Sequence, residues 1–338
     1  MEDNLQKFLF LGVMISVVMF SSRNSLYKQR ATAVFEGASL ARLDPPLFVL
    51  QSPEVAEPKQ EILPQAVEQQ GSVESQDGLV ARAFYKHKDD PPPEINVQAA
   101  LVGDVQNGEV FWSRNPDKRW PLASITKLMT AAVISRNMPL NQSTTFTASD
   151  FRIESLEQNA SSSRFNMSSS SRFTIGDLRK AMLLVSSNES AEAAARVYGR
   201  GDFLAKMNAN VREWGLTNTF FDDPTGLSSS NQSTAADLLK LAGFIYNRYP
   251  EIFRITKIPL VSILDLNSGK KILIKNINNF AGTADFLGGK TGYTDEASGN
   301  LLSVFSYRGR PIVIIVLGTE DRFHDTEKLL NWFKNNFK

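Results

Sequence analysis

Strand-like segments at both ends of residues 95–338, with helical patterns between them, constrain the fold of this chain more than any other feature. Six short segments show the apolar pattern of paired strands: residues 98–105, 109–113, 258–264, 271–277, 301–307 and 311–317. The first two flank Gln106-Asn107-Gly108, and an Asn-Gly pair between apolar runs indicates a β-hairpin. We therefore expect an α+β domain, with an antiparallel sheet built from distant parts of the sequence, flanking helices and a helical subdomain.

The stretch between these strand patterns shows helical periodicity. Thr174 is expected to cap a helix that ends at Val185, and the break Ser186-Ser187-Asn188 precedes an alanine-rich helix beginning near Glu189. Further helices are expected over residues 201–214, 235–249 and 326–337. The serine-rich stretch 155–172 and the turn-rich stretch 222–227 are expected to be loops.

Composition excludes several classes of site. The chain has 338 residues, 42% of them apolar, which is enough for one large domain with extensions or for two modest domains. It has no cysteine, which excludes disulfides and thiolate sites, and two histidines do not favour a histidine-rich zinc site or a Ser-His-Asp triad. A net charge of +1 gives no electrostatic case for nucleic acid as a partner. We expect neither a metal nor a cofactor.

An apolar run at residues 8–20 predicts a membrane segment. Its 13 residues are short for a spanning helix, which needs about 20, and no typical signal-peptidase site follows it. We expect an uncleaved signal-anchor within residues 1–30, the alternatives being a cleaved signal peptide or a buried helix. Arg23, Lys28 and Arg30 follow the run, and this charge pattern conflicts with an extracytoplasmic location for the rest of the chain.

Residues 31–94 have the composition of a disordered linker. Eight of the fifteen prolines lie here, among glutamine, glutamate and serine. A flexible segment of 64 residues reaches on the order of 45 Å on average, which could hold a domain of residues 95–338 away from a membrane. A loose tail without function is the alternative.

The stretch around Ser124 carries the first candidate for chemistry. Ile125, Leu128 and Met129 recur at helical spacing and predict a buried helix, in which Ser124 and Lys127 share another face. A hydroxyl beside an amine could be a nucleophile and its base. The pattern alone is weak, because Ser-x-x-Lys also occurs at 25–28 and 268–271.

Two further motifs follow in a fixed order: Ser186-x-Asn188, and then Lys290-Thr291-Gly292. This ordered set resembles that of class A β-lactamases and penicillin-binding proteins. The flanking sequences, among them PLASITKLMT and GKTGYTDEA, are similar to the serine D-alanyl-D-alanine carboxypeptidases, the low-molecular-weight penicillin-binding proteins. The resemblance covers residues 95–338 and implies a fold like that of the β-lactamases and transpeptidases.

Ser-x-Asn also occurs at Ser229/Asn231 and Ser298/Asn300, so the second motif has to be chosen. The family places this motif between two helices that face the nucleophile. Only Ser186 falls at such a predicted break, and we therefore assign the motif to it.

The resemblance implies a role for each reacting group. Ser124 would attack the carbonyl between two D-alanines and form an acyl-enzyme, and Lys127 would accept its proton. Burial and the positive charge of Lys290 would lower the pKa of Lys127 and favour its neutral form. Ser186 would relay the proton to the leaving amine, and the backbone N–H groups of Ser124 and Tyr293 would form the oxyanion hole.

Substrate binding would fall to a second group of residues. Asn188 would hold the substrate amide and Lys127. Lys290 and Thr291 would bind the terminal carboxylate, and Gly292 would let the substrate lie along the strand. Asp223 and Asp295 are expected to be structural turn residues.

The implied function is a membrane-tethered serine D,D-carboxypeptidase of the bacterial cell envelope, with its catalytic domain outside the cytoplasm. Its partners would be peptidoglycan stem peptides as substrate and β-lactam antibiotics as covalent inhibitors. The alternatives are a D,D-endopeptidase, a β-lactamase, and a catalytically idle wall-binding protein. Residues 215–233 hold no glutamate, which argues against the class A β-lactamase mechanism, and the intact motifs argue against an idle protein.

Overall fold

The computed structural model describes residues 83–151 and 168–338. The predicted signal-anchor and linker residues 31–82 lie outside the described residues, as do residues 152–167 of the predicted serine-rich loop. Within the two described ranges, no helix is both long and apolar enough to cross a bilayer.

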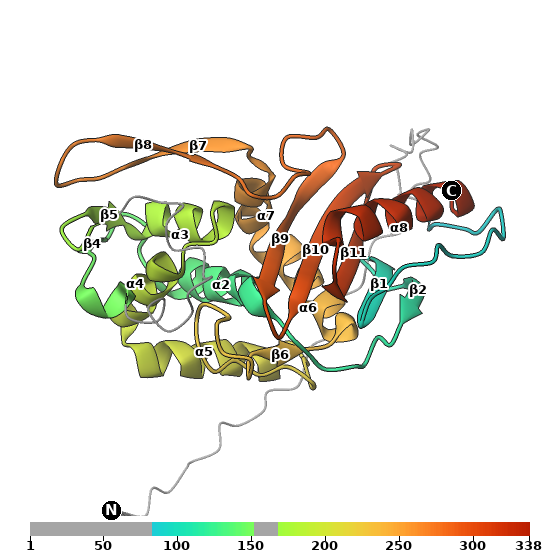
Figure 1. The fold of residues 1–338 in the computed structure, drawn as a ribbon, viewed down its shortest axis with the longest axis horizontal. Helices are drawn as coiled ribbons and strands as arrows, with labels where there is room; N and C mark the ends of the chain where they lie inside the picture. The colour runs from blue at the N-terminus through green and yellow to red at the C-terminus, as the bar shows by residue number, and fades with distance from the viewer. Residues whose placement is uncertain (1–82, 152–167) are drawn as a thin grey trace, which may run out of the picture. The chain divides into compact units, whose positions relative to one another are not determined.

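A five-stranded antiparallel sheet joins the two ends of the domain sequence (Figure 1). Its strands, in spatial order, are β2 (Val110–Arg114), β1 (Ala99–Asp104), β11 (Arg310–Thr319), β10 (Ser298–Tyr307) and β9 (Phe286–Thr294). Ala99 lies opposite Leu317, so the first strand pairs with the last one. This confirms the predicted antiparallel sheet built from distant segments.

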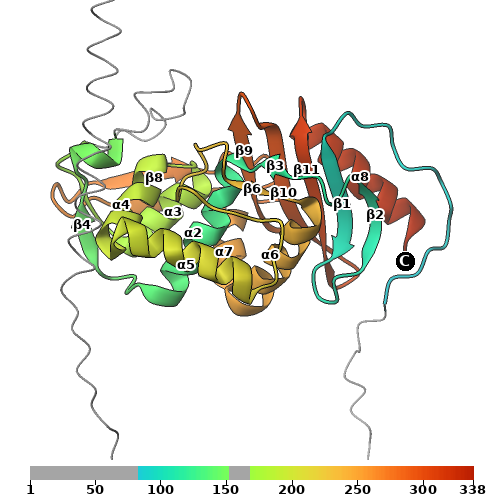
Figure 2. The same cartoon turned by 90° about the horizontal axis from the view of Figure 1, so that it is seen from below.

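The described helices are α2 (Lys127–Asn137), α3 (Ile175–Leu184), α4 (Asn188–Tyr198), α5 (Arg200–Glu213), α6 (Ala235–Arg248), α7 (Pro250–Lys257) and α8 (Arg322–Asn336). Helices α6, α7 and α8 pack on the sheet, whereas α2 to α5 pack on one another and form the helical subdomain. Ala100 and Val102 belong to the core under α8, whereas Ala99 and Leu101 belong to the core shared with the other helices. Figure 2 shows the sheet between α8 on one side and α6 on the other. Side chains that alternate along each strand therefore fill two separate apolar layers.

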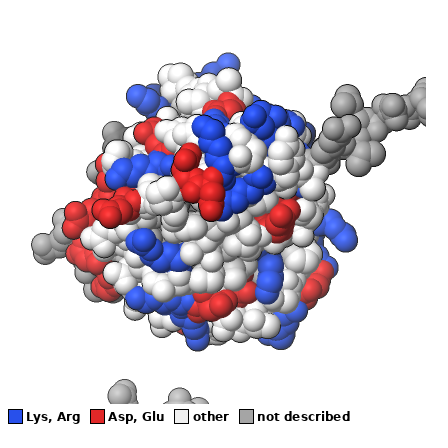
Figure 3. Space-filling view, turned by 90° about the vertical axis from the view of Figure 1, so that its right-hand side faces the viewer, with Lys and Arg blue, Asp and Glu red and all other residues white. Residues whose placement is uncertain are grey.

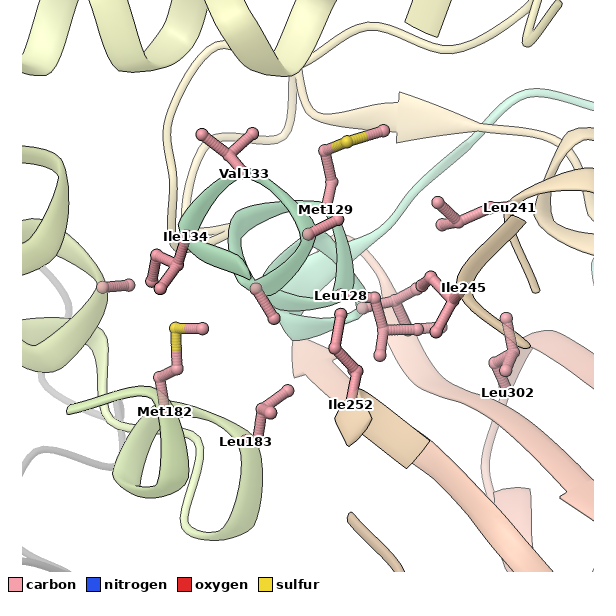
Figure 4. Close-up of a cluster of buried hydrophobic side chains, with 14 of the residues drawn as sticks. Leu128, Met129, Val133, Ile134, Met182, Leu183, Leu241, Ile245, Ile252 and Leu302 are labelled. Atoms are coloured by element: carbon pink, nitrogen blue, oxygen red, sulfur yellow. The ribbon is translucent and has the colours of Figure 1, made fainter. Parts of the chain in front are cut away.

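The centre of the helical subdomain is α2. All its residues from Lys127 to Ile134 are buried, as expected of a helix that is covered on every side. Figure 4 shows Leu128 next to Ile245 of α6 and Ile252 of α7, while Ile134 points toward Met182 of α3. The residue that opens this helix is Lys127, so an ionisable amine is placed in the interior.

Short elements account for most differences from the predicted pattern. The small strands are β3 (Trp120–Pro121), β4 (Ser143–Thr145), β5 (Arg172–Thr174), β6 (Gln232–Ser233), β7 (Leu260–Leu264) and β8 (Lys271–Lys275). The hairpin β7–β8 forms where expected but stays outside the main sheet. Helix α7 was not predicted, because its eight residues directly follow α6 and are too few for a separate helical pattern to be recognised in the sequence.

The packed unit begins before the predicted boundary at residue 94. The Phe84 ring is buried against Phe111 and Phe333, and Tyr85 exchanges backbone hydrogen bonds with Lys338. The Trp332 indole N–H donates to the carbonyl of Asp90. The prediction of a linker reaching residue 94 is therefore wrong for residues 83–94, because the aromatic anchor Phe84 holds this segment on α8.

Candidate active site

The sequence predicted that Ser124 lies in the first turn of an α-helix. In the structure it lies in a tight turn just before α2. The turn is the 3-10 helix η1 (Ala123–Thr126), and α2 begins at Lys127. Lys127 Nζ is 2.9 Å from Ser124 Oγ, so the predicted pairing of hydroxyl and amine is present. Ala123 has a φ of +48°, a left-handed conformation that costs a non-glycine residue roughly 1–3 kcal/mol. The surrounding packing must therefore hold this turn in place.

Two acceptors besides Ser124 fix the Lys127 amine. Its Nζ donates to Asn188 Oδ1 at 2.7 Å and to the backbone carbonyl of Thr225 at 2.7 Å. The lysine is 0% exposed. Helix α4 and the loop that contains Thr225, which both follow Lys127 in the sequence, thus contact the same amine.

The loop that supplies the Thr225 carbonyl is held by a carboxylate. Asp223 Oδ1 accepts hydrogen bonds from the backbone N–H groups of Thr225 and Gly226, and Oδ2 accepts one from Ser228. Gly226, at φ +90°, allows close approach, since a Cβ there would lie 1.9 Å from the Ala123 carbonyl oxygen. Asp223 is thus a structural turn residue, as expected.

Asn231 closes the same loop, although it belongs to a copy of Ser-x-Asn that was not assigned a site role from the sequence. Its Oδ1 accepts from the N–H groups of Asp222 and Asp223, and its Nδ2 donates to Thr126 Oγ1 at 3.1 Å. The side chain is completely buried. Asn231 therefore joins the loop to the turn that carries the nucleophile.

The second motif occupies the predicted break between α3 and α4. Ser187 caps α4, because its Oγ accepts the N–H of Ser190 at 3.0 Å. Ser186 has a φ of +64°, again an unfavourable conformation for a non-glycine residue. Strained residues of this kind concentrate at functional sites, which is consistent with the choice of Ser186 for the motif.

The two glutamates at the start of α4 are both engaged. Glu189 Oε2 accepts a hydrogen bond from Ser187, and Arg200 donates twice to Glu192, at 2.9 and 3.2 Å. Burial raises the pKa of the Glu192 carboxyl, and the hydrogen bonds from Arg200 act in the opposite direction. These carboxylates support the helix junction next to Asn188.

The third motif lies on β9, the edge strand of the sheet. Lys290 Nζ donates to Ser186 Oγ at 3.0 Å and to the carbonyl of Thr291 at 2.9 Å. Lys290 and Thr291 are both buried. At Gly292 an added Cβ would lie 2.7 Å from the Leu122 carbonyl oxygen. The structure therefore shows a reason for glycine at position 292 that the sequence did not predict. Without a side chain, Gly292 lets β9 pack closely on the turn that carries Ser124.

Arg322, at the start of α8, reaches the same peptide. Its Nη1 donates to the carbonyl oxygen of Gly292 at 2.7 Å. In a trans peptide the C=O and the following N–H point in opposite directions, so the N–H of Tyr293 points away from Arg322. An added Cβ on Gly292 would also lie 3.3 Å from the Ser124 nitrogen. The two N–H groups expected to form the oxyanion hole thus belong to neighbouring backbone segments.

Comparison with known proteins identifies the family. The family model described as D-alanyl-D-alanine carboxypeptidase, peptidase family S11, matches residues 86–321, which is more than half of the chain. The chain belongs to this family.

Relatives of known name and structure agree with the assignment to the D-alanyl-D-alanine carboxypeptidase family. The chain is 32% identical to the D-alanyl-D-alanine endopeptidase of Pseudomonas aeruginosa, covering 72% of this chain and 82% of that protein. It is 28% identical to the D-alanyl-D-alanine carboxypeptidase DacA of Haemophilus influenzae, covering 73% and 64%. Penicillin-binding protein D2 of Listeria monocytogenes, solved with cefotaxime, superposes with a TM-score of 0.62 at 29% identity, covering 72% of this chain and 98% of that one. The fold is the mixed α/β fold of the penicillin-binding proteins.

Three groups of this carboxypeptidase-family site were missed at the level of sequence: the Thr225 carbonyl, Asn231 and Arg322. The Thr225 contact is made by the backbone and leaves no side-chain signal. Asn231 was visible only as a repeat of a common motif, and Arg322 lies outside all three motifs. The predicted side chains form two hydrogen-bonded groups, Ser124–Lys127–Asn188 and Ser186–Lys290.

Proposed function

We propose that this enzyme removes the terminal D-alanine from peptidoglycan stem peptides through an acyl-enzyme on Ser124. The observation that carries the proposal is the contact between Ser124 Oγ and the buried Lys127 amine. A hydroxyl in this position has a base within hydrogen-bond reach, and that base is held by Asn188 and the Thr225 carbonyl.

The surroundings of Lys127 suit a neutral amine. A neutral amine has two N–H donors and one lone pair. Asn188 Oδ1 and the Thr225 carbonyl are acceptors for the two donors, and the Ser124 hydroxyl can donate to the lone pair. Removal of the ammonium form from water is costly, so burial favours the form that can accept a proton from Ser124.

The oxyanion of the tetrahedral intermediate would be stabilised by the N–H groups of Ser124 and Tyr293. Arg322 holds the Gly292–Tyr293 peptide from its carbonyl end, and its positive charge polarises the N–H at the other end. In this mechanism Arg322 is a positioning residue and does not touch the substrate.

Departure of D-alanine needs a proton at its nitrogen. Ser186 Oγ, hydrogen-bonded to Lys290, can supply that proton. The proton that Lys127 took from Ser124 would then replace it on Ser186. Lys290 and Thr291 would bind the carboxylate of the terminal D-alanine, and Asn188 the substrate amide. Water then hydrolyses the ester on Ser124 and frees the shortened peptide. A β-lactam would acylate the same hydroxyl.

Endopeptidase action on cross-links is the second candidate. The relative from Pseudomonas aeruginosa, at 32% identity, is named an endopeptidase. DacA of Haemophilus influenzae, which is named a carboxypeptidase, has the lower identity of 28%. Both reactions transfer the same D-alanyl carbonyl to Ser124. They differ in the leaving group, which is free D-alanine in one case and the amine of a cross-linked peptide in the other.

One experiment separates these activities. Wild type and Ser124→Ala are incubated with labelled penicillin, with a D-Ala-D-Ala pentapeptide and with a peptide dimer cross-linked through a D-alanyl amide. We expect labelling and D-alanine release by wild type only. Equal labelling of both proteins would contradict the role of Ser124. Cleavage of the dimer alone would favour the endopeptidase, rapid loss of label would favour a β-lactamase, and labelling without cleavage would favour an idle binder.

We also propose that residues 1–30 anchor the enzyme in the bacterial cell membrane and that the catalytic domain lies outside the cytoplasm. The apolar run at 8–20 and the location of peptidoglycan support this proposal. The test is labelling of intact cells with a membrane-impermeant fluorescent penicillin, followed by membrane fractionation. Labelling only after lysis would contradict it.

A further inference from the structure

The hairpin β7–β8 and its flanks carry an unusual share of the exposed apolar surface. Ten large apolar side chains are exposed among the described residues. Half of them lie within residues 258–273: Ile258, Leu260, Leu264, Leu266 and Leu273. Single exposed leucines need no explanation, but a concentration of them marks an interaction surface.

The strand register places Leu260, Leu264 and Leu273 on one face. Val261 lies opposite Ile274, and Ile263 lies opposite Ile272, on the face that packs toward α3. The outer face consists of three cross-strand pairs: Leu260 with Lys275, Ser262 with Leu273, and Leu264 with Lys271. The solvated face of such a hairpin is normally polar, yet here half of the outer positions are leucine.

The charges on this outer face have one sign. Lys271 and Lys275 lie on it, and the exposed Lys270 precedes β8. Asp265, the one acidic residue between 258 and 277, is buried and accepts hydrogen bonds from Arg172 N–H and Ser268 Oγ. By contrast, the face shown in Figure 3 carries positive and negative side chains next to one another.

We propose that the outer face of the β7–β8 hairpin docks on the surface of an anionic phospholipid membrane. Leucine side chains would enter the boundary between headgroups and acyl chains, and the lysines would lie at the anionic headgroups. A protein partner is the less favoured occupant, because protein interfaces are enriched in aromatic residues and arginine and depleted in lysine. The outer face has three leucines, two lysines and a serine.

The chain outside the described structure is long enough for this contact. Residues 21–82 separate the apolar run at 8–20 from the first described residue, and a linker of the kind that their composition predicts would reach on the order of 40 Å on average. A tether of this kind raises the local concentration of the domain at the membrane, so that a weak contact suffices.

The hairpin is also joined to the active site. The Ile277 N–H at its base donates to the carbonyl of Leu184 at 3.1 Å, two residues before Ser186. A hairpin bound to the membrane would therefore fix the orientation of the site wall that carries Ser186.

The test uses the full chain in lipid vesicles and exploits its lack of cysteine. Leu273→Cys on the hairpin and Asn107→Cys on the exposed β1–β2 turn are each labelled with a polarity-sensitive fluorophore. The vesicles contain lipids brominated on the acyl chain, either in phosphatidylcholine alone or with added phosphatidylglycerol. Thermal melting of each variant verifies the fold, and both positions are remote from the catalytic groups.

We expect bromolipid quenching in phosphatidylglycerol vesicles to be several-fold stronger at position 273 than at 107. This difference should shrink in phosphatidylcholine, at high salt, and when Lys270, Lys271 and Lys275 are all changed to glutamine. Equal quenching at the two positions would overturn the proposal. So would a difference that is insensitive to lipid charge, or a label at 273 that is already shielded without lipid, as a protein segment or a second copy would cause.

Discussion

The two walls of the active site hold their lysines in different ways. On the helical wall, Lys127 is bound by Ser124, Asn188 and the Thr225 carbonyl, contributed by a turn, a helix and a loop. On the sheet wall, Lys290 is bound by Ser186 and by the carbonyl of its own neighbour Thr291. Both lysines are almost completely buried. Lys127 is thus held by contacts from three separate segments, whereas Lys290 is held within its own strand and by the junction between α3 and α4.

This difference fits the roles proposed above for the two lysines. A base must lose and regain a proton, so its contacts have to suit the neutral amine. A group that recognises a carboxylate must stay charged, and a rigid strand presents it well. If the two lysines had the same role, the same substitution would have the same effect on both.

The largest effect is expected for Lys127→Arg. Guanidinium stays protonated in proteins and cannot act as the base. Because general-base catalysis contributes about 10²–10⁴-fold, the rate of acylation by a β-lactam should fall by that order. The rate is measured by stopped flow or gel fluorescence with a labelled penicillin. Acylation at near wild-type rate would remove Lys127 from the mechanism.

A smaller loss is expected for Lys290→Arg on the sheet wall. Arginine keeps the positive charge that the substrate carboxylate needs, but it fits the contact with Ser186 less well. Acylation should slow by roughly 10-fold, on the order of one misplaced charge-assisted hydrogen bond. The comparison with Lys127→Arg uses the same assay, and equal losses in the two variants would contradict the roles proposed for the two lysines.

On the same wall, Arg322→Gln should slow acylation by about 10-fold or less, since removal of a whole oxyanion donor costs about 10²–10³. The loss should appear also in the affinity for a boronic acid that forms a tetrahedral adduct on Ser124. Arg322→Lys should restore part of it. A variant that melts earlier but binds the boronic acid normally would show that Arg322 is only structural.

On the helical wall, Asn231→Ala should act mainly on stability. It leaves the N–H groups of Asp222 and Asp223 without their buried acceptor, at a cost of about 1–3 kcal/mol in the free energy of unfolding. Denaturant unfolding measures this loss, and Asn208→Ala, in which Asn208 bonds the backbone of Phe221, is the matched control. If acylation falls only in the Asn231 variant, the loop positions the Thr225 carbonyl.

The smallest expected effect is on stability at low pH, and it concerns Asp265, which belongs to neither wall of the active site. Burial acts to raise the pKa of Asp265, but hydrogen bonds from Arg172 and Ser268 outweigh it and leave the pKa below the usual 3.8. A depressed carboxyl pKa stabilises the fold above the unfolded value, and this contribution is lost as the pH falls through the folded value. Asp265→Asn should therefore reduce the dependence of the melting temperature on pH below about 4. An unchanged dependence would contradict this.

The sequence predicted those elements that depend on a periodic apolar pattern or on neighbouring residues. Short apolar runs next to turn residues predicted β1, β10 and β11, and the predicted helix break at Ser186-Ser187-Asn188 was correct. The 3-10 turn at Ser124 was missed, because its conformation is fixed by contacts with Asn231 and Gly226 about one hundred residues later. The same holds for Arg322, whose contact with Gly292 depends on how α8 packs on the sheet.

The central claim is that Ser124 is the nucleophile of this D-alanyl-D-alanine carboxypeptidase family member. The most direct measurement is mass spectrometry of the protein after brief incubation with benzylpenicillin, followed by proteolysis. We expect one penicilloyl group per chain, on the peptide that contains Ser124, and none in Ser124→Ala. An adduct on any other residue, or an adduct of equal yield in the Ser124→Ala variant, would contradict it.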